Sequence, residues 1–392
     1  MEVALHELGE IFTGNTPSKK NKNYWNSEDT VFIKPNDLNN NNLLLNDKNN
    51  EYISKEALAQ ARIVGRNSIL VTCIGTIGKI AITTDAKTAF NQQINAIVPN
   101  KNVYTKYLAY ALMHYKPRLA ALANAPVVPI INKKQFSNFK INLNLDKEIQ
   151  YTVIRQLDLV GEIIKNKNRQ LSKLDELIKA RFVEMFGDPV IEQKFKDKYS
   201  MTEVCQIIDG DRGKNYPHND DFSNSGYCLF LNAKNVTTKG FNFENQMYIS
   251  QKKDSELKKG KLRRGDIVLT TRGTIGNLAF YDSEIPFKNI RINSGMVIIR
   301  LDANRINEMF FIEQFKMQLF KVKQKIASGT AQPQLPISTM NNIKILLPPL
   351  SLQNEFANFV HQVDKSKFEN IVYLNKTLSS KILSQLGDAI RD

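Results

Sequence analysis

The chain contains one fourteen-residue pattern twice. Residues 69–82 read ILVTCIGTIGKIAI and residues 267–280 read IVLTTRGTIGNLAF, with seven identical positions. The identical pairs are Ile69/Ile267, Thr72/Thr270, Gly75/Gly273, Thr76/Thr274, Ile77/Ile275, Gly78/Gly276 and Ala81/Ala279. The period is about half of the 392 residues. A repeat at this distance indicates duplication of a whole domain rather than a solenoid of short units.

The similarity extends beyond this pattern. Further matching pairs are VFIKPNDL (31–38) with LFLNAKNV (229–236), NQQINAIVP (91–99) with NSGMVIIRL (293–301), and FSNFKINL (136–143) with MNNIKILL (340–347). Strand-like runs rich in Val, Ile, Phe and Thr alternate with turn residues in each copy, and helical stretches follow at 104–115 and 307–326. We therefore predict an α+β fold with two homologous mixed α/β domains, 1–145 and 188–348, each with a twisted, largely antiparallel sheet.

A long helix is predicted after each domain, over 146–187 and 349–392, because glycine and proline are nearly absent there. Apolar residues in the first helix recur at steps of three and four, which is a heptad seam. The predicted seam residues are Leu157, Val160, Ile164, Leu171, Leu174 and Ile178, and Ile371, Leu374, Leu378 and Ile382. Helices of about 54–60 Å with such stripes are expected to pair as an antiparallel coiled coil, which relates the halves by a pseudo-two-fold axis.

Charge points to the class of partner. The formal net charge is +15, and the hydrophobic fraction of 42% is that of a soluble globular protein. A polyanion is a natural reason for such an imbalance, with nucleic acid the first expectation, an anionic membrane surface the second and an ordinary basic protein the third. No signal peptide and no apolar run of about 20 residues is found, so we expect a cytoplasmic protein that does not bind membranes.

No catalytic constellation is found. The segment GTIGK (75–79) is too short between its glycines for a phosphate loop, and Ile80 follows its lysine. The cysteines, Cys73, Cys205 and Cys228, are too far apart to predict a disulfide framework or zinc site. We predict no catalytic residue, no metal and no cofactor in this chain. Two alternatives stay open: a self-contained DNA methyltransferase or nuclease with a diverged active site, and a basic nucleic-acid-binding scaffold.

The loops supply candidates for DNA contact. A GTIG turn is either a tight strand turn or a loop pressed against a DNA phosphate, since glycine permits close backbone approach. The residue before each turn differs, Ile74 in one copy and Arg272 in the other, and this arginine either contacts guanine or is an ordinary surface charge. For any one of these residues, solvated loop surface is the competing interpretation. The candidates are Lys19, Lys20, Lys22, Trp25, Ile74, Gly75, Thr76, Gln92 and Gln93, and Arg212, Lys214, Asn215, Arg272, Gly273, Thr274, Ser294, Gln332 and Gln334.

In the order in which these features follow one another, the whole chain resembles the specificity (S) subunit of type I restriction–modification systems. The resemblance also rests on FNQQINAI (90–97), RFVEMFGDP (181–189) and NIKILLPPLSLQNEFANFV (342–360). One departure is that the first long helix lacks the Pro-Pro found before the second. The resemblance implies two target recognition domains, each reading half of a two-part site in double-stranded DNA, with helices that set the gap.

The same resemblance implies partners. Two modification (M) subunits would dock on this chain, bind S-adenosylmethionine and methylate adenine. Restriction (R) subunits, which use ATP with Mg, would join them to translocate and cut DNA. The specificity subunit would itself have no active site.

Overall fold

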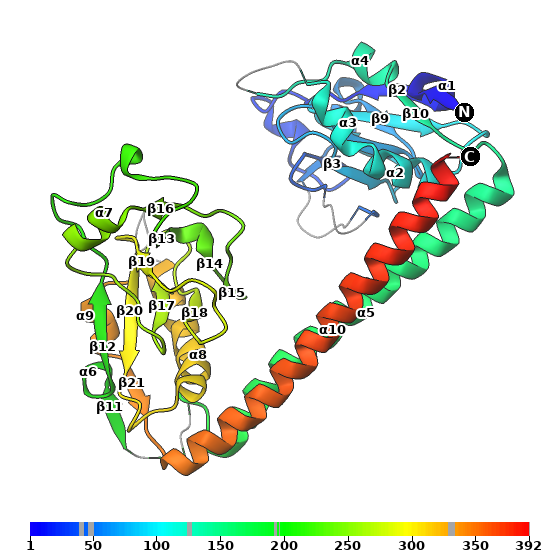
Figure 1. Ribbon diagram of the computed structural model, residues 1–392. Helices are drawn as coiled ribbons and strands as arrows, with labels where there is room; N and C mark the ends of the chain where they lie inside the picture. Colours follow the sequence, from blue (N-terminus) through cyan, green and yellow to red (C-terminus); the bar gives the residue numbers. More distant parts are fainter. Residues whose placement is uncertain are drawn as a thin grey trace. The chain divides into compact units, whose positions relative to one another are not determined.

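The computed structural model describes residues 1–38, 43–45, 51–123, 128–191, 194–195, 197–327 and 334–391, with the backbone alone at 325–327 and 374–391. It divides into two compact units. Unit 1 comprises Met1–Lys167 and Val372–Asp392, and unit 2 comprises Asn168–Ile371. Figure 1 shows that each unit combines strands and helices, as the α+β prediction requires.

Unit 1 contains two four-stranded sheets. One is antiparallel in the order β2 (Gly9–Thr13), β9 (Ile94–Pro99), β6 (Ile69–Thr72), β7 (Ile80–Ile82). The other has the order β4 (Glu51–Ile53), β3 (Thr30–Ile33), β8 (Thr88–Phe90), β5 (Ile63–Val64), and its β3–β8 pair is parallel. The shorter helices are α1 (Leu5–Leu8), α2 (Thr105–His114), α3 (Lys116–Ala121) and α4 (Lys133–Ser137).

Unit 2 repeats this plan. Its antiparallel sheet has the order β12 (Cys205–Asp209), β20 (Met296–Leu301), β17 (Ile267–Thr270), β18 (Leu278–Phe280). A second sheet, β16 (Tyr248–Ile249), β13 (Cys228–Leu231), β19 (Ile290–Ile292), again contains one parallel pair, β13–β19. Unit 2 also contains β14 (Val236–Thr237), β15 (Gly240–Phe241), α6 (Met201–Val204), α7 (Gln251–Glu256), α8 (Glu308–Ala327) and α9 (Ile337–Asn341).

The repeated strand separates two apolar cores in each unit. Alternate residues of a strand face opposite sides of a sheet. In β6, Ile69 and Val71 join the core that contains α2, whereas Leu70 joins the core shared with β3 and β8. In β17, Ile267 and Leu269 face α8, and Val268 faces the second sheet. A strand buried on both faces explains why this segment is almost entirely apolar in both copies.

Each unit joins its first strand to its last. The pair is β1 (Glu2–Ala4) with β10 (Lys140–Asn142) in unit 1, and β11 (Lys198–Ser200) with β21 (Lys344–Leu346) in unit 2. Both pairs are antiparallel. The chain therefore enters and leaves the sheets of each unit at neighbouring points.

Two long helices follow, α5 (Lys147–Phe186) and α10 (Leu350–Arg391) (Figure 1). Their contacts run in opposite directions along the chain. Asp175 forms a 2.7 Å ion pair with Lys367, and Arg181 forms one of 3.1 Å with Glu355. Phe182 contacts Phe356 edge to face, with ring centroids 5.3 Å apart. The helices are therefore antiparallel where both belong to unit 2.

The seam prediction needs one correction. Ile178 is buried, and Leu157, Val160, Ile164, Leu171 and Leu174 are half-buried, but Ile371 is 43% exposed. The residues of α10 that face inward are Phe356, Val360, Val363, Lys367 and Asn370. Asn370, and not the predicted Ile371, therefore occupies the inward position at this point of the helix. Because this inward row contains a lysine and an asparagine, the spacing of apolar residues alone did not identify it. Leu374, Leu378 and Ile382 lie where α10 is described by its backbone alone, so their seam positions stay predictions.

Candidate nucleic-acid interface

A buried threonine holds each GTIG turn. Thr72 and Thr270 are both fully buried. The Oγ1 of Thr72 accepts a hydrogen bond from the backbone N–H of Lys79 at 2.9 Å and donates to the carbonyl oxygen of Thr76. Thr270 makes the same two bonds, with Asn277 (3.0 Å) and Thr274. The identical threonines therefore act as the same internal brace in both copies.

The glycines of these turns are required by backbone conformation. The φ of Gly75 is +75° and that of Gly273 is +70°, a left-handed region that L side chains rarely adopt. A Cβ at either position would have no atom within 4 Å. The first glycine of each turn thus lies in open space, which leaves room for another molecule to approach the backbone.

Four segments meet at each turn. In unit 1 the backbone N–H of Cys73 donates to Gln93, that of Ile131 donates to Cys73, and that of Gly75 donates to Pro129. In unit 2 the N–H of Thr271 donates to Gly295 and that of Leu335 to Thr271. The fourth segment passes close to the backbone of the third at a glycine. A Cβ on Gly14 would lie 2.2 Å from the carbonyl oxygen of Asn91, and a Cβ on Gly210 would lie 2.2 Å from that of Asn293. We call this arrangement the turn cluster, formed by 13–16, 73–78, 91–93 and 129–131 in unit 1 and by 209–212, 271–276, 293–295 and 334–335 in unit 2.

The side chains exposed on the two turn clusters differ. In unit 1 the hydroxyl of Thr16 donates to Oε1 of Gln92 at 2.6 Å. The corresponding contact in unit 2 joins Nη2 of Arg212 to the carbonyl oxygen of Ser294 at 3.3 Å. Arg212 also pairs with Asp209 at 3.1 Å. One cluster thus has no charged side chain and is rich in amide and hydroxyl groups, whereas the other contains arginine and aspartate side chains.

The residue before the turn shows the same contrast. Ile74 is half-buried and forms an isolated β-bridge with Ile130. Arg272 forms the corresponding bridge with Gln334, and its side chain is exposed. The guanidinium of Arg272, with its five N–H donors, thus belongs to the exposed surface of the cluster.

Several predicted residues have structural partners instead. Gln93 accepts a hydrogen bond from Asn91 at 3.1 Å, and Asn215 donates to the carbonyl oxygen of Glu256 at 3.3 Å. Thr76, Thr274, Lys20 and Lys214 are exposed, and Gln332 lies outside the described residues. The lysine of GTIGK, Lys79, donates to the carbonyl oxygen of Pro35 at 3.1 Å, so it braces the domain.

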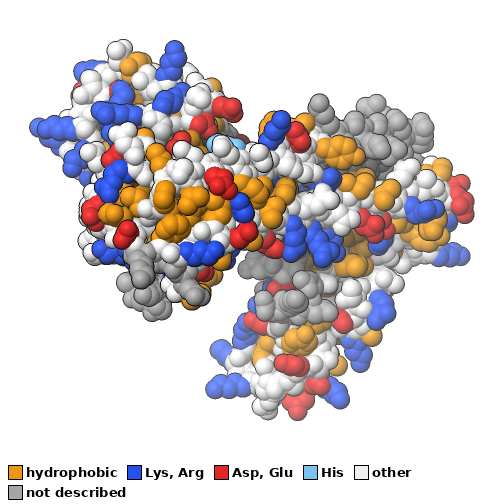
Figure 2. All heavy atoms as spheres, turned by 90° about the horizontal axis from the view of Figure 1, so that it is seen from below, with side chains coloured by type: hydrophobic (Ala, Val, Ile, Leu, Met, Phe, Trp, Pro, Cys, Tyr) orange, Lys and Arg blue, Asp and Glu red, His pale blue; other side chains and the backbone are white. Residues whose placement is uncertain are grey.

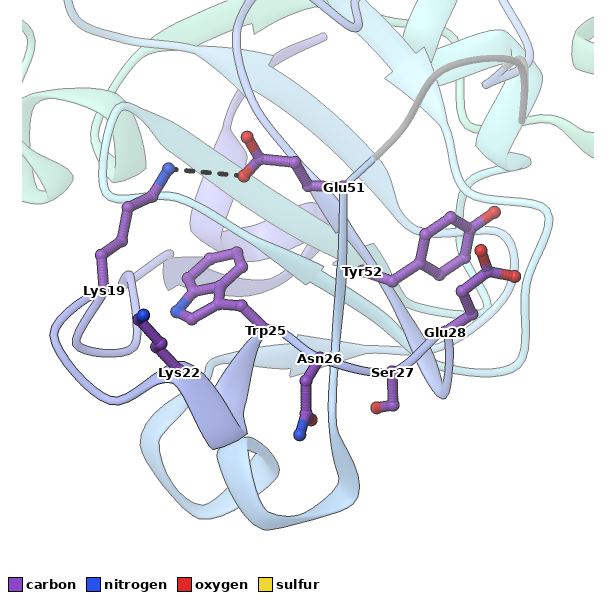
Figure 3. A pocket seen from close by; sticks show the side chains of 8 residues that line it. All are labelled: Lys19, Lys22, Trp25, Asn26, Ser27, Glu28, Glu51 and Tyr52. Atoms are coloured by element: carbon purple, nitrogen blue, oxygen red, sulfur yellow. Dashed lines mark ion pairs between the residues drawn. The ribbon is translucent and has the colours of Figure 1, made fainter.

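The loop of unit 1 that carries Lys19, Lys22 and Trp25 lines a separate hollow of about 750 Å³ (Figure 3). Lys19 extends toward Glu51, at 3.5 Å, and its Nζ lies 5.1 Å from the centroid of the Trp25 ring. Trp25 also packs edge to face on Phe32 at 5.1 Å. The hydrogen bond from Lys34 is the main reason that the pKa of Glu51 lies below its ordinary value. Lys19 and Trp25 are therefore engaged with their own domain, whereas Lys22 at the rim is exposed.

On the face drawn in Figure 2, charge is dispersed rather than gathered into one patch. Figure 2 shows Lys and Arg side chains spread over the face in view, with acidic side chains among them. Within the described residues, no group of His, Cys, Asp and Glu could hold a metal ion. None of the described helices is long and apolar enough to cross a membrane.

Thr16, Thr72 and Thr270 were missed as functional residues. The identity of Thr72 and Thr270 within the repeat was a usable signal, because a polar residue kept inside a buried strand needs an internal partner. Nothing local marks Thr16, whose role depends on a contact with Gln92 far along the chain.

Comparison with known proteins identifies the fold and family. Residues 1–176 and 194–379 each match the model of the type I restriction modification DNA specificity domain. The chain belongs to this family. Its members are the specificity subunits of type I restriction–modification systems, which are non-catalytic, carry two target recognition domains and assemble with other subunits. The resemblance seen in the sequence is thereby confirmed.

Individual relatives are distant. The MjaIX specificity subunit of Methanocaldococcus jannaschii is 24% identical over 98% of this chain and 90% of its own. The HindI specificity subunit of Haemophilus influenzae is 29% identical over 46% of this chain and 40% of its own. The EcoR124I/EcoR124II specificity subunit of Escherichia coli is 29% identical over 43% of each chain.

Solved structures share the fold. The S subunit from M. genitalium superposes with a TM-score of 0.50 at 16% identity, covering 100% of this chain and 96% of that one. A chain from a structure of type I restriction–modification complex assembly gives 0.55 at 15% identity, covering 98% and 95%.

Proposed function

We propose that each turn cluster reads one half of a two-part DNA site, while α5 and α10 set the unread gap between the halves. One observation carries the proposal. The same hydrogen-bonded frame occurs twice, and the exposed side chains on it differ in chemistry. A constant frame with variable tips suits two readers of different sequences.

The tips favour particular bases. Gln92 has its amide oriented by Thr16 and can offer an acceptor and donors together, which is the pattern that adenine pairs with in the major groove. Arg272 can donate two parallel hydrogen bonds to guanine. Lysines such as Lys20 and Lys214 would hold phosphates, which fixes the register without reading sequence.

The proposal includes the partner subunits. Two modification subunits would bind S-adenosylmethionine and methylate adenine at the site that this chain selects, and restriction subunits would use ATP and Mg to cut unmodified DNA. The domain limits 1–145 and 188–348, with helical spacers 146–187 and 349–392, belong to the same proposal. They are supported by the start of α5 at Lys147 and of α10 at Leu350.

Methylation-sensitive sequencing of host DNA, with and without this gene, tests the function. We expect a two-part motif with a fixed gap that disappears on deletion. The variant Arg272→Ala should relax one base pair in one half-site, at a cost of about 1–3 kcal/mol in discrimination. Lys214→Ala is the matched control and should weaken binding without changing the motif. The proposal is contradicted if the methylated motif is continuous. It is also contradicted if Arg272→Ala changes both half-sites of the motif.

A further inference from the structure

Two glutamines at the starts of the long helices are completely buried. Gln150 lies in the first turn of α5 and Gln353 in the first turn of α10, and both have 0% exposed surface. Glutamine is mostly found on protein surfaces, and a buried amide is costly unless its groups are hydrogen-bonded. Two such residues at equivalent positions therefore call for a physical reason.

The two amides make the same three hydrogen bonds. Oε1 of Gln150 accepts from the backbone N–H of Tyr104 at 2.8 Å, and Nε2 donates to the carbonyl oxygens of Asn102 and Asn144 at 3.1 Å each. Tyr104 is the N-cap of α2, and Asn144 lies between β10 and α5. The side chain thus ties the start of α5 to the start of α2 and to the loop that leads into α5.

Gln353 repeats this in unit 2. Its Oε1 accepts from the backbone N–H of Asn307 at 2.8 Å. Its Nε2 donates to the carbonyl oxygens of Arg305, at 3.1 Å, and Pro348, at 2.8 Å. Asn307 directly precedes α8, as Tyr104 precedes α2. The same clamp therefore fixes each long helix to the helix that covers the antiparallel sheet of its own unit.

The other polar ties at these junctions differ. In unit 1, Asp158 of α5 accepts from Lys106 and Tyr110 of α2, both at 2.7 Å. In unit 2, Asn307 instead donates to Asn354 at 3.0 Å. Among the described residues, the glutamine clamp is the tie that both junctions share in the same geometry. A requirement common to both halves is therefore better assigned to the clamp than to its neighbours.

We propose that Gln150 and Gln353 are positioning residues that fix the direction in which each long helix leaves its recognition domain. Three bonds to backbone groups at separate points oppose tilting of the helix, which one bond or an apolar contact would permit. The clamps thereby restrict DNA recognition to a single gap between half-sites. This inference rests on the proposed function, because it explains how strictly the gap is selected.

The test uses the complex of this chain with its modification subunits. Duplexes would carry both half-sites at the preferred gap, or at gaps one base pair shorter or longer. Gln150→Met and Gln353→Met keep the side-chain length but remove the three hydrogen bonds. We expect the ratio of methylation at the preferred gap to that at neighbouring gaps to fall about tenfold, because only part of the free energy of the three lost hydrogen bonds distinguishes one gap from another. The preferred bases in each half-site should not change.

Gln156→Met is the matched control, because Gln156 is exposed on the same helix. Gln150→Glu keeps the acceptor for the N–H of Tyr104 but sets a carboxylate oxygen, which cannot donate, against the two carbonyl oxygens. Its ratio should therefore fall at least as far as that of Gln150→Met. Hydrogen exchange provides a readout if methylation is lost. The amides of residues 147–153 should exchange faster in Gln150→Met, while those of β6 are unchanged.

The outcomes separate the two proposals. A wild-type complex without any gap preference defeats the proposed function itself. A wild-type preference that persists unchanged in folded Gln150→Met and Gln353→Met, or unchanged exchange at 147–153, overturns the clamp and leaves the proposed function standing.

Discussion

Arg291 shows at the residue scale that not every cation of this basic chain is available to DNA. It is 5% exposed and pairs with the equally buried Asp254 at 2.5 Å. Its guanidinium also donates to the carbonyl oxygens of Lys259, Asp254 and Leu257 at 2.6–2.9 Å. Four hydrogen bonds thus join α7 and the following loop to β19, which makes Arg291 a structural residue.

Replacing Asp254 by Asn should destabilise unit 2 by about 3–5 kcal/mol, because it leaves a buried arginine charge without its partner. Urea unfolding at pH 7, followed by circular dichroism, measures the change. Asp220→Asn, at an exposed site, is the control and should change stability by less than about 0.5 kcal/mol. A similar stability for the two variants would contradict the assigned role.

The same carboxylate gives a pH dependence. Burial alone raises the pKa of Asp254, but hydrogen bonds from Lys261 and Arg291 outweigh it and hold this pKa below its ordinary value of 3.8. The folded unit therefore binds fewer protons than the unfolded chain near that pH. The stability from Asp254 is present above pH 3.8 and is lost as the pH falls through the lowered pKa. Unfolding curves of wild type and Asp254→Asn should converge below pH 3.8; parallel curves would disprove this.

Another residue-scale prediction concerns the turns. Gly273→Ala should destabilise unit 2 by about 1–2 kcal/mol, since alanine disfavours a φ of +70° even where space is open. Gly161→Ala is the opposite case, because Gly161 lies exposed in α5 with nothing near its Cβ. It should stabilise the helix by roughly 0.5–1 kcal/mol. Equal effects of the two substitutions in thermal unfolding would rule out the backbone explanation.

At the scale of elements, α5 belongs to two cores. Its start contributes Val153 and Leu157 to the core of unit 1, and its end contributes Phe182 and Phe186 to that of unit 2. The helix is continuous between them. Its length and helical phase are therefore the quantities that a spacer would transmit.

Inserting seven residues into α5 near Asn166 should lengthen the gap of the recognised site while leaving both half-sites unchanged. Seven residues add about 10 Å and nearly two full turns, so the gap grows by at most about three base pairs. An insertion of one residue is the control, because it rotates the following helix by about 100° and should abolish methylation. A gap unaltered by the seven-residue insertion would refute the spacer role.

These elements also show what sequence could predict. The repeat, with its apolar strands and helical stretches, was enough for α2, α8, β6 and β17, because their burial pattern is local. Gln150 and Gln353 were missed, since a glutamine in an amphipathic helix normally faces water and its partners are distant in sequence. Ile371 was misplaced because Lys367 and Asn370 occupy the inward row of α10. For the site, the turns were found, whereas the contact of Thr16 with Gln92 depends on packing.

At the scale of the whole molecule, the three cysteines are separate probes of the two units. Cys73 lies in unit 1, and Cys205 and Cys228 lie in unit 2. Burial is the main cause that raises the pKa of each thiol to about 12. The thiolate is the form that attacks a thiol reagent, so all three cysteines should be unreactive in the native protein at pH 8.

Labelling in increasing urea, read by mass spectrometry of the separate peptides, checks this. Cys205 and Cys228 should become reactive together as unit 2 unfolds, and Cys73 should follow the unfolding of unit 1. An exposed cysteine peptide added as a control confirms that the reagent stays active. Rapid modification of any of the three without urea would contradict their burial.

The neighbouring first and last strands of each unit have a consequence for how such a chain can evolve. Because β1 lies beside β10 and β11 beside β21, all loops of a unit are carried between two adjacent attachment points. Segments joined in this way tolerate excision and replacement, as domain insertions and circular permutations do. Recombination at these two strand pairs would exchange one recognition domain as a cassette. A new combination of half-sites would then arise without any change in the helices.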